Sequence, residues 1–538
     1  LSLHDALPIY SRNTSVTLAS IATTLRDGAR ARGAGDWGCM HRLYTLSRMC
    51  IPSQLTHIMR SCPPSSVEHE AKRFDDLMYR EMASFFQWPC DATPGLPEQR
   101  ARAMLFLPNR LGGLGMPSLA KLVNNAYVAS VGMTGPIIAR LLSAAPPDAA
   151  AAIPELAAAF QHAKTLGTTN LANLNNAMLL FSGAPLMHAQ TELSKVTEER
   201  ARDEMLRTLF PNPQEQAHIR GAAKSGQWLT DYGAALDDKS FNLLVNLRAG
   251  FTPFTQRGKC GHNGCSVVVD TDTLARYHPI TCAGNKGFGT RRHNFIRDAL
   301  LRELSALARY EPAGTPTISV YKEPELMGWG YKPTAATQAS FDNGTATADR
   351  VPVRGDVLVT LNGKKTMIDI VVTGDTSRGV VGSAAASKYK YKMDFYHNHW
   401  ILHQDDLVPA AFEASGYLDP RSARSLRAIF LAATPTVEAA NKHWGRFLTS
   451  VSTGLQHANA DMHSAYIARS LPRAVRGTGA AGGGAAPGTV PGAGGATGTG
   501  TGGGTTAATA VPVANAATPL TATTGPGTAA TATAPVAV

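Results

Sequence analysis

Four side chains of the kinds that bind metals lie within a short segment near the middle of the chain. Cys260 is followed by Cys265, twelve residues separate Cys265 from His278, and Cys282 comes next, in a C-x4-C-x12-H-x3-C pattern. Zinc prefers four tetrahedral sulfur and nitrogen ligands, and two close pairs of such residues supply them. The spacing therefore predicts a zinc site, and the alternative is four unrelated residues in a loop.

A second pair of residues, Asp356 and Asp369, is suited to binding a divalent cation. Asn362-Gly363 separates two apolar runs between them, which favours a two-residue type I′ hairpin. That turn predicts a register in which the two aspartates face each other, with Cβ atoms ~4.5–5.5 Å apart. Facing carboxylates repel, and Mg²⁺ removes the conflict because it binds carboxylates together with phosphate oxygens. The alternative is two solvated aspartates at strand ends.

The residues beside the two aspartates are apolar, so a buried strand platform is expected to hold them: Val357, Val359, Ile368 and Ile370. Lysines follow in 383–396 (SAAASKYKYKMDFY), a predicted helix. A lysine near a metal-bound water can orient that water and stabilise a pentacoordinate phosphate. Lysines on one helix are more often a solvated face, and the pattern alone leaves open which one acts: Lys388, Lys390 or Lys392.

Helices are expected to position these groups. Residues 36–250 have a mostly helical pattern, and the segment 73–87 places Phe74, Leu77, Met78 and Met82 at helical spacing. From about Phe251 the composition changes to Cys, His, Gly and short β-branched runs, with a predicted helix after Arg291. The hairpin and two more helices follow, which indicates a small α/β domain.

The charge balance favours a polyanionic partner. The chain of 538 residues has 51 Lys and Arg against 40 Asp and Glu, a net charge of +11, and all of these lie before residue 477. The window 256–310 holds nine basic and four acidic residues, so the excess gathers around the predicted zinc site. Nucleic acid is the simplest partner for such a surface. Seven cysteines are too few for a disulfide scaffold, and without an apolar run of ~18 residues no membrane span is expected.

The two ends differ from the rest of the chain. Residues 1–9 (LSLHDALPI) resemble a translated sequencing adapter, so we expect the natural reading frame to continue upstream. Residues 1–10 also lack the cationic stretch and apolar core of a secretory signal. Residues 477–538 contain no charged or aromatic side chain, a composition typical of a disordered tail.

Taken in order, these segments resemble the C-terminal part of a non-LTR retrotransposon polyprotein with a restriction-like endonuclease. The segments 55–78 and 107–122 (LPNRLGGLGMPSLAKL) look like the thumb that follows a reverse-transcriptase palm, and 225–251 is similar to the linker before a zinc knuckle. The CCHC pattern is then followed by RRHNFIRDALL (291–301), which resembles the first helix of the nuclease. Finally, RGD-x12-D resembles the PD-(D/E)XK core.

The resemblance implies a mixed fold with an all-α thumb and linker, a zinc knuckle, an α/β restriction-endonuclease-like domain and a disordered tail. The implied boundaries are 1–9 for the adapter, 10–165 for thumb-like helices, 166–255 for a helical linker, 256–290 for the CCHC knuckle, 291–435 for the endonuclease, 436–476 for a C-terminal helix and 477–538 for the tail.

The resemblance also implies roles for particular residues. Counting back from Val408-Pro409, which look like the family's VPF strand, aligns Lys392 with the catalytic lysine and Tyr396 with the tyrosine after it. Glu413 matches the glutamate of a later E-x-x-G segment. The implied catalytic residues are Asp356, Asp369 and Lys392, with Mg²⁺ on the two aspartates. The implied nucleic-acid contacts are Arg291, Arg292, His293 and Arg297, although His293 is equally suited to capping a helix.

The sequence departs from the family pattern at two places. Asp369 is followed by Ile370-Val371, with no lysine two residues on, and Gly355 stands where proline or alanine usually precedes the first aspartate. The implied function is a nuclear endonuclease, truncated of its polymerase palm, that nicks target DNA for target-primed reverse transcription and binds element RNA. One alternative is an inactive knuckle remnant that only binds nucleic acid. Another is a RecB-like or resolvase-like cellular nuclease, which the thumb-like segment 107–122 argues against.

Three other patterns in the chain have simpler explanations than a catalytic or metal site. Phe74-Asp75-Asp76 is similar to the polymerase YxDD turn but lies in a helical pattern, so we expect thumb surface there and no polymerisation by this chain. Glu303 is a candidate third carboxylate, although a helix-surface glutamate is commoner. Three histidines could bind a metal but are more often a solvated helix face: His397, His399 and His403.

Overall fold

A computed structural model describes residues 39–470 with gaps at 92, 142–153, 166–179, 181–185, 224, 231–235, 253–257, 261, 263–264, 283, 285, 310–316, 346–350, 375–379 and 404–405. The predicted adapter segment 1–9 and the predicted tail 477–538 lie outside the described residues. None of the described helices is at once long enough and apolar enough to cross a membrane.

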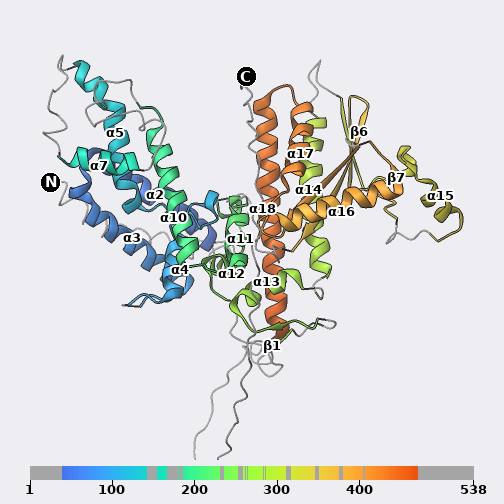
Figure 1. Ribbon diagram of the computed structural model, residues 1–538, viewed down its shortest axis with the longest axis horizontal. Helices are drawn as coiled ribbons and strands as arrows, with labels where there is room; N and C mark the ends of the chain where they lie inside the picture. The colour runs from blue at the N-terminus through green and yellow to red at the C-terminus, as the bar shows by residue number, and fades with distance from the viewer. Residues whose placement is uncertain are drawn as a thin grey trace, which may run out of the picture. The chain divides into compact units, whose positions relative to one another are not determined.

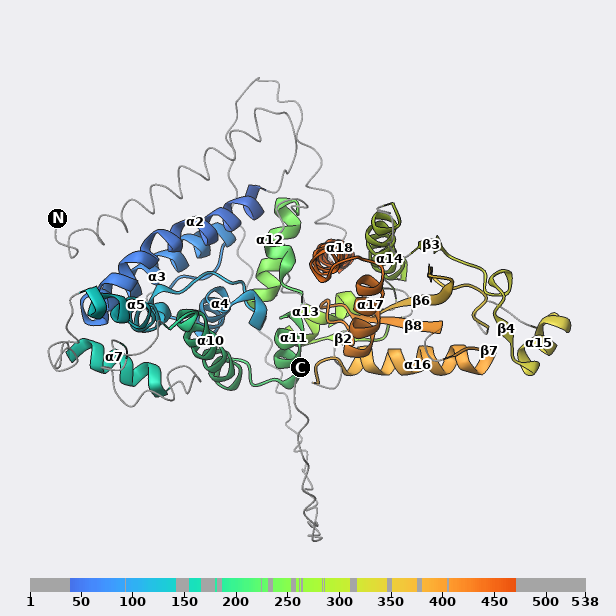
Figure 2. The same ribbon diagram turned by 90° about the horizontal axis from the view of Figure 1, so that it is seen from above.

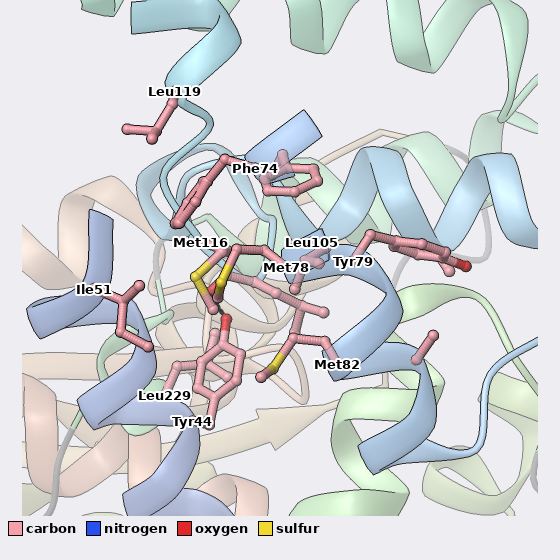
Figure 3. Packing of buried hydrophobic residues seen from close by; sticks show 14 of the residues in the cluster. Tyr44, Ile51, Phe74, Met78, Tyr79, Met82, Leu105, Met116, Leu119 and Leu229 are labelled. Atoms are coloured by element: carbon pink, nitrogen blue, oxygen red, sulfur yellow. Dashed lines mark hydrogen bonds between the residues drawn. The ribbon is translucent and has the colours of Figure 1, made fainter. Parts of the chain in front are cut away.

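The first half of the described chain is helical. Five of its helices share one apolar core: α2 (Cys39–Ser61), α3 (Pro64–Phe86), α4 (Leu96–Leu105), α5 (Leu119–Leu141) and α12 (Asp238–Ala249). Figure 3 shows Tyr44 of α2 near Met78 and Met82 of α3 in this core. The predicted helix at 73–87 is confirmed within α3, because its apolar positions at helical spacing face the core.

Further helices extend this region. They are η1 (Asn109–Leu111), α7 (Pro154–Thr165), α10 (Ala189–Thr208), α11 (Pro213–Ala222) and η2 (Gln227–Leu229). The helices α7 and α10 pack on α5 through a second apolar cluster that includes Tyr127, Phe160 and Leu193. The helical content expected for 10–165 and 166–255 is therefore found in their described parts.

A four-stranded mixed sheet forms the core of the second half. Its order is β3 (Ile318–Lys322), β5 (Val357–Leu361), β6 (Lys364–Thr373) and β8 (Leu407–Glu413). The strand β5 is antiparallel to both β3 and β6, and β8 runs parallel to β6. A parallel neighbour requires a crossover, and α16 (Ser383–His399) supplies it.

Helices cover both faces of this sheet. Figure 2 shows α14 (Lys286–Ala308) and α18 (Val437–Ser470) on one side of β6 and β8 and α16 on the other. The apolar core on the first side also includes residues of α17 (Pro420–Ala432). The long helices α14 and α18 run side by side (Figure 1). On the α16 side, Leu358 and Met367 pack with Tyr396 and Trp400.

Smaller elements complete the second half. A two-stranded pair joins β4 (Lys332–Pro333) to β7 (Trp400–Ile401), beside η5 (Met327–Trp329) and α15 (Ala335–Asp342). A second pair joins β1 (Gly258–Lys259) to β2 (Val268–Val269), and α13 (Asp272–Thr281) follows it. The described chain is thus mostly helical with a small mixed sheet.

The predicted hairpin register is confirmed. Leu361 pairs with Lys364 across the turn, and Val359 pairs with Thr366. Asn362 and Gly363 have φ angles of 49° and 80°, the left-handed values that a type I′ turn needs at both central positions. The platform residues of the two strands are buried: Val357, Val359, Ile368 and Ile370.

The expectation that Asp75 lies on the surface is wrong. This carboxylate is buried in α3 and accepts hydrogen bonds from Ser118 Oγ at 2.5 Å and from the backbone amides of Leu119 and Ala120 at 2.9 and 3.2 Å. Those amides belong to the first turn of α5, where a helix has unsatisfied donors. Asp75 therefore fixes the start of α5, a tertiary role that its place in a helical pattern does not reveal.

Candidate functional site

The four predicted metal ligands come from the β1–β2 pair and from α13. Cys260 follows β1, and its amide donates to Val267 O at 2.9 Å, which turns the chain back toward β2. Thr271 caps α13 by accepting a hydrogen bond from Leu274 N. His278 lies in the last turn of this helix, and Cys282 follows its end.

The structure brings the four side chains together. Their ligand atoms all lie within 4.8 Å of one another. Cys260 Sγ is 3.7 Å from Cys282 Sγ, and Cys265 Sγ is 3.5 Å from His278 Nε2. A tetrahedron with Zn–S bonds of ~2.3 Å and a Zn–N bond of ~2.0 Å has edges of roughly 3.8 Å between sulfurs and roughly 3.5 Å between sulfur and nitrogen. The cluster could therefore hold a metal ion such as zinc.

The surroundings of the cluster suit a cation. Burial raises the pKa of the Cys282 thiol to about 12, and the neighbouring Cys260 adds to that effect. Burial, together with the nearby His262, lowers the pKa of His278. The site thus combines a neutral imidazole with thiols whose protons a metal ion can displace. Tyr466 of α18 packs edge-on against His278, with ring centroids 5.8 Å apart.

No second group of this kind occurs among the described residues. The three histidines near the end of α16 do not form a metal cluster there. His397 is exposed, and His399 Nδ1 lies 2.9 Å from Thr337 Oγ1.

The second predicted site centres on Asp369 in β6. Asp369 is 5% exposed, and its side chain faces α16. Lys392 Nζ lies 2.8 Å from Asp369 Oδ2, and the Tyr396 hydroxyl donates to Oδ1 at 3.1 Å. Because Lys392 and Tyr396 are four residues apart, they lie on one face of α16.

Asp356 precedes β5 at the same end of the sheet. The amide of Ile370 donates to Asp356 Oδ2 at 2.5 Å, so β6 holds this carboxylate next to Asp369. His293 of α14 lies with Nε2 3.1 Å from Asp356 Oδ1 and Nδ1 3.1 Å from Ile370 O. His293 is in the interior of α14, so the alternative that it caps a helix is wrong.

The electrostatics of the two aspartates reflect their closeness. Burial raises the pKa of Asp369 to about 6, with the charge of Lys392 opposing the rise and the charge of Asp356 adding to it. Burial lowers the pKa of His293, but the hydrogen bond to Asp356 and the two carboxylate charges outweigh this, so its pKa is raised. Burial also raises the pKa of Tyr396, which keeps it a hydrogen-bond donor. The site therefore attracts positive charge.

The three candidate lysines occupy different environments. Lys392 is the one that contacts Asp369. Lys388 lies over the ring of Tyr391, 5.2 Å from its centroid, and Lys390 is exposed. Of the three lysines, Lys392 is thus the one that the structure places against Asp369, and which of them is catalytic stays a prediction.

The predicted nucleic-acid contacts on α14 mostly have partners within the chain. Arg291 is exposed and lies 2.7 Å from Asp461 Oδ2. Arg292 is buried and donates to Ile280 O, and the buried Arg297 pairs with Glu323. Contact with nucleic acid stays a prediction for these residues. Arg291 could make such a contact with the least change of side-chain position, because it is already exposed.

The two other carboxylates singled out from the sequence lie apart from this contact network. Glu303 of α14 is buried against α18, where Oε2 is 3.0 Å from His443 Nδ1. Glu413 ends β8 and is buried, with its amide donating to Tyr417 O at 2.8 Å. Sequence reasoning missed two partners of Asp356: the Ile370 amide, which lies across the hairpin, and His293, whose contact depends on packing between distant segments.

Comparison of the chain with protein-family models, with curated proteins and with solved structures finds no match.

Proposed function

We propose that the chain is a retrotransposon-derived, Mg²⁺-dependent DNA endonuclease that nicks target DNA for target-primed reverse transcription. The observation that carries this proposal is the meeting of Asp356, Asp369 and Lys392 at one end of the sheet. Two adjacent carboxylates suit a divalent cation, and a lysine beside them suits a phosphodiester. The order of the sequence motifs, which resembles that of the polyprotein, supports the same function.

Each residue has a distinct part in the proposed mechanism. Asp356 and Asp369 would hold Mg²⁺, which supplies charge neutralisation and a more acidic water when bound. The Lys392 ammonium, 2.8 Å from Asp369, would donate to a phosphate oxygen or orient the attacking water. Tyr396 fixes the orientation of Asp369, and the Ile370 amide fixes that of Asp356.

In this proposal, other parts of the chain bind zinc and nucleic acid. The cluster of Cys260, Cys265, His278 and Cys282 binds Zn²⁺ and forms a knuckle. With the basic window 256–310 it contacts DNA or element RNA, and the protein acts in the nucleus. Arg291 is the most accessible of the predicted contacts on α14.

A nicking assay on supercoiled plasmid tests the enzymatic proposal. Wild-type protein is expected to nick with Mg²⁺ and not with EDTA, and Asp369→Ala should lose the activity because one cation ligand is gone. Asp394→Asn is the matched control, since Asp394 is an exposed aspartate on α16. Equal nicking by wild type and Asp369→Ala would exclude the mechanism.

One observation favours an alternative function as a binding protein without nuclease activity. In this structure each aspartate already has an internal partner, His293 for Asp356 and Lys392 for Asp369. These contacts balance charge without a cation and would compete with one. The alternative predicts salt-sensitive binding of DNA or RNA by wild type, with no Mg²⁺-dependent nicking under any condition that supports binding.

A further inference from the structure

A small cavity lies among α11, α12, α13 and α18, where Tyr277 and Ile280 of its lining flank the proposed metal ligand His278 on α13. Its volume is about 60 Å³. Two arginines and two histidines line it, and no aspartate or glutamate does. The side chains that matter for its chemistry are Trp228, Arg248, Arg276, Gln456, Asn459 and His463.

The positive charge around this cavity exceeds the negative charge available to it. Arg276 forms a buried ion pair with Glu215, whose Oε2 also lies 3.8 Å from Arg100, and the charge of Asp272 acts on Arg100 as well. Arg248 is paired with no carboxylate among the described residues. Arg248 donates hydrogen bonds to the carbonyl oxygens of Gly112 at 3.0 Å and Ala222 at 3.2 Å, which carry no net charge.

Burial makes this imbalance costly. Desolvation lowers the pKa of Arg248 to about 10, which still leaves it charged at neutral pH. A buried charge that no opposite charge balances destabilises the folded state. An anion inside the cavity would remove that cost.

Two buried polar atoms at the cavity also lack partners. Trp228 Nε1 and His463 Nδ1 are inaccessible to solvent and have no hydrogen-bond partner among the described residues. Both residues line the cavity. An indole N–H can only donate, so its missing partner is an acceptor.

We propose that this cavity binds one small inorganic anion of the size and charge of chloride, held by Arg248 and by the N–H groups of Trp228 and His463. Water would satisfy hydrogen bonds, and a volume of about 60 Å³ has room for roughly two molecules, but water leaves the charge of Arg248 unbalanced. Larger anions, such as a phosphodiester with its sugars, exceed the cavity. The anion ties α11 and α12 to α13, which carries His278, and to α18.

Bromide, which is larger than chloride but chemically similar, serves as the probe. Crystals of the wild-type protein soaked in bromide should show an anomalous peak within contact distance of Arg248 and Trp228. Density for water alone, without an anomalous peak, would overturn the proposal. This measurement needs no variant and no nuclease activity, so its outcome is independent of the proposed function.

Halide-dependent thermal unfolding gives a second readout. At constant ionic strength, replacing sodium methanesulfonate by sodium bromide should raise the melting temperature of the wild type. Trp228→Phe keeps the aromatic ring and removes the N–H, so apparent bromide affinity should fall roughly three- to tenfold, the effect of one hydrogen bond. Trp444→Phe is the control, because Trp444 packs in the core beside α17. Equal bromide responses in all three proteins would contradict the site.

Discussion

The ammonium group of Lys392 lies 2.8 Å from a carboxylate oxygen of Asp369, although one residue belongs to α16 and the other to β6. Tyr396, one helical turn after Lys392, donates to the other carboxylate oxygen. Two side chains of one helix therefore bind both oxygens of a buried aspartate. This arrangement distinguishes Lys392 from the lysines that precede it on α16.

Lys392→Ala should therefore reduce Mg²⁺-dependent nicking far more than a change at a neighbouring lysine. Loss of a preorganised donor to the transition state lowers rates by about 10²-fold or more. Lys390→Ala is the matched control, because Lys390 is exposed on the same helix. Single-turnover nicking rates at saturating protein provide the comparison. An equal loss of nicking rate in both variants would mean that nicking depends on the overall charge of the helix and not on the contact with Asp369.

The cysteine cluster makes a separate prediction about metal content. Purified wild type should contain one zinc ion per chain by elemental mass spectrometry, and Cys260→Ser with Cys265→Ser should contain none, because two thiolate ligands are lost. The variant should also melt at a lower temperature, since metal binding and folding are coupled. Cys90→Ser, at an exposed cysteine, is the control. Unchanged zinc content in the double variant would remove the assignment.

Asp75 and Asp76 are neighbours with different expected contributions to stability. Asp75→Ala removes the acceptor for three donors at the start of α5 and should lower the free energy of unfolding by about 1–3 kcal/mol. Asp76→Ala should cost ~1 kcal/mol or less, because its ion pair with Arg102 is partly exposed. Denaturant titration of both variants measures the difference. Similar losses would show that the cap contributes little.

The sequence predicts what local chemistry determines. The Asn362-Gly363 turn sets the hairpin register, because two-residue loops with left-handed residues allow one pairing. The cysteine pairs could also be recognised, since their spacing is itself the signal. His293 is different, because its contact with Asp356 depends on how α14 packs against the sheet. The expected exposure of Asp75 is wrong for the same reason. A helical pattern shows which face is apolar, but not which buried polar group caps another helix.

The contact between Lys392 and Asp369 is only partly predictable from the sequence. The sequence pattern does not distinguish the three lysines of this helix as candidates for the catalytic lysine. The resemblance to a family favours Lys392. Only the packing of α16 against β6 and β8 gives that lysine a distinct environment. Long-range packing of this kind has no period in the sequence, so a single chain does not reveal it.

Burial of His463 predicts a specific acid sensitivity. Desolvation, with the charge of His218 adding to it, lowers its pKa from 6.5 to about 3, and Arg248 and Arg276 line the same cavity. Because the unfolded chain binds a proton near pH 6.5 and the folded chain does not, stability is retained above that pH and lost as the pH falls toward 3. Between pH 6.5 and 5 this group alone should remove about 2 kcal/mol from the free energy of unfolding.

Denaturant titrations in halide-free buffer at several pH values measure this effect. His463→Gln should flatten the dependence on pH below 6.5, because glutamine does not titrate. His397→Gln, at an exposed histidine of α16, should leave the wild-type dependence unchanged. If His463→Gln and wild type lose stability in parallel on acidification, His463 is not the group that resists protonation in the fold, and other buried groups must account for the acid sensitivity.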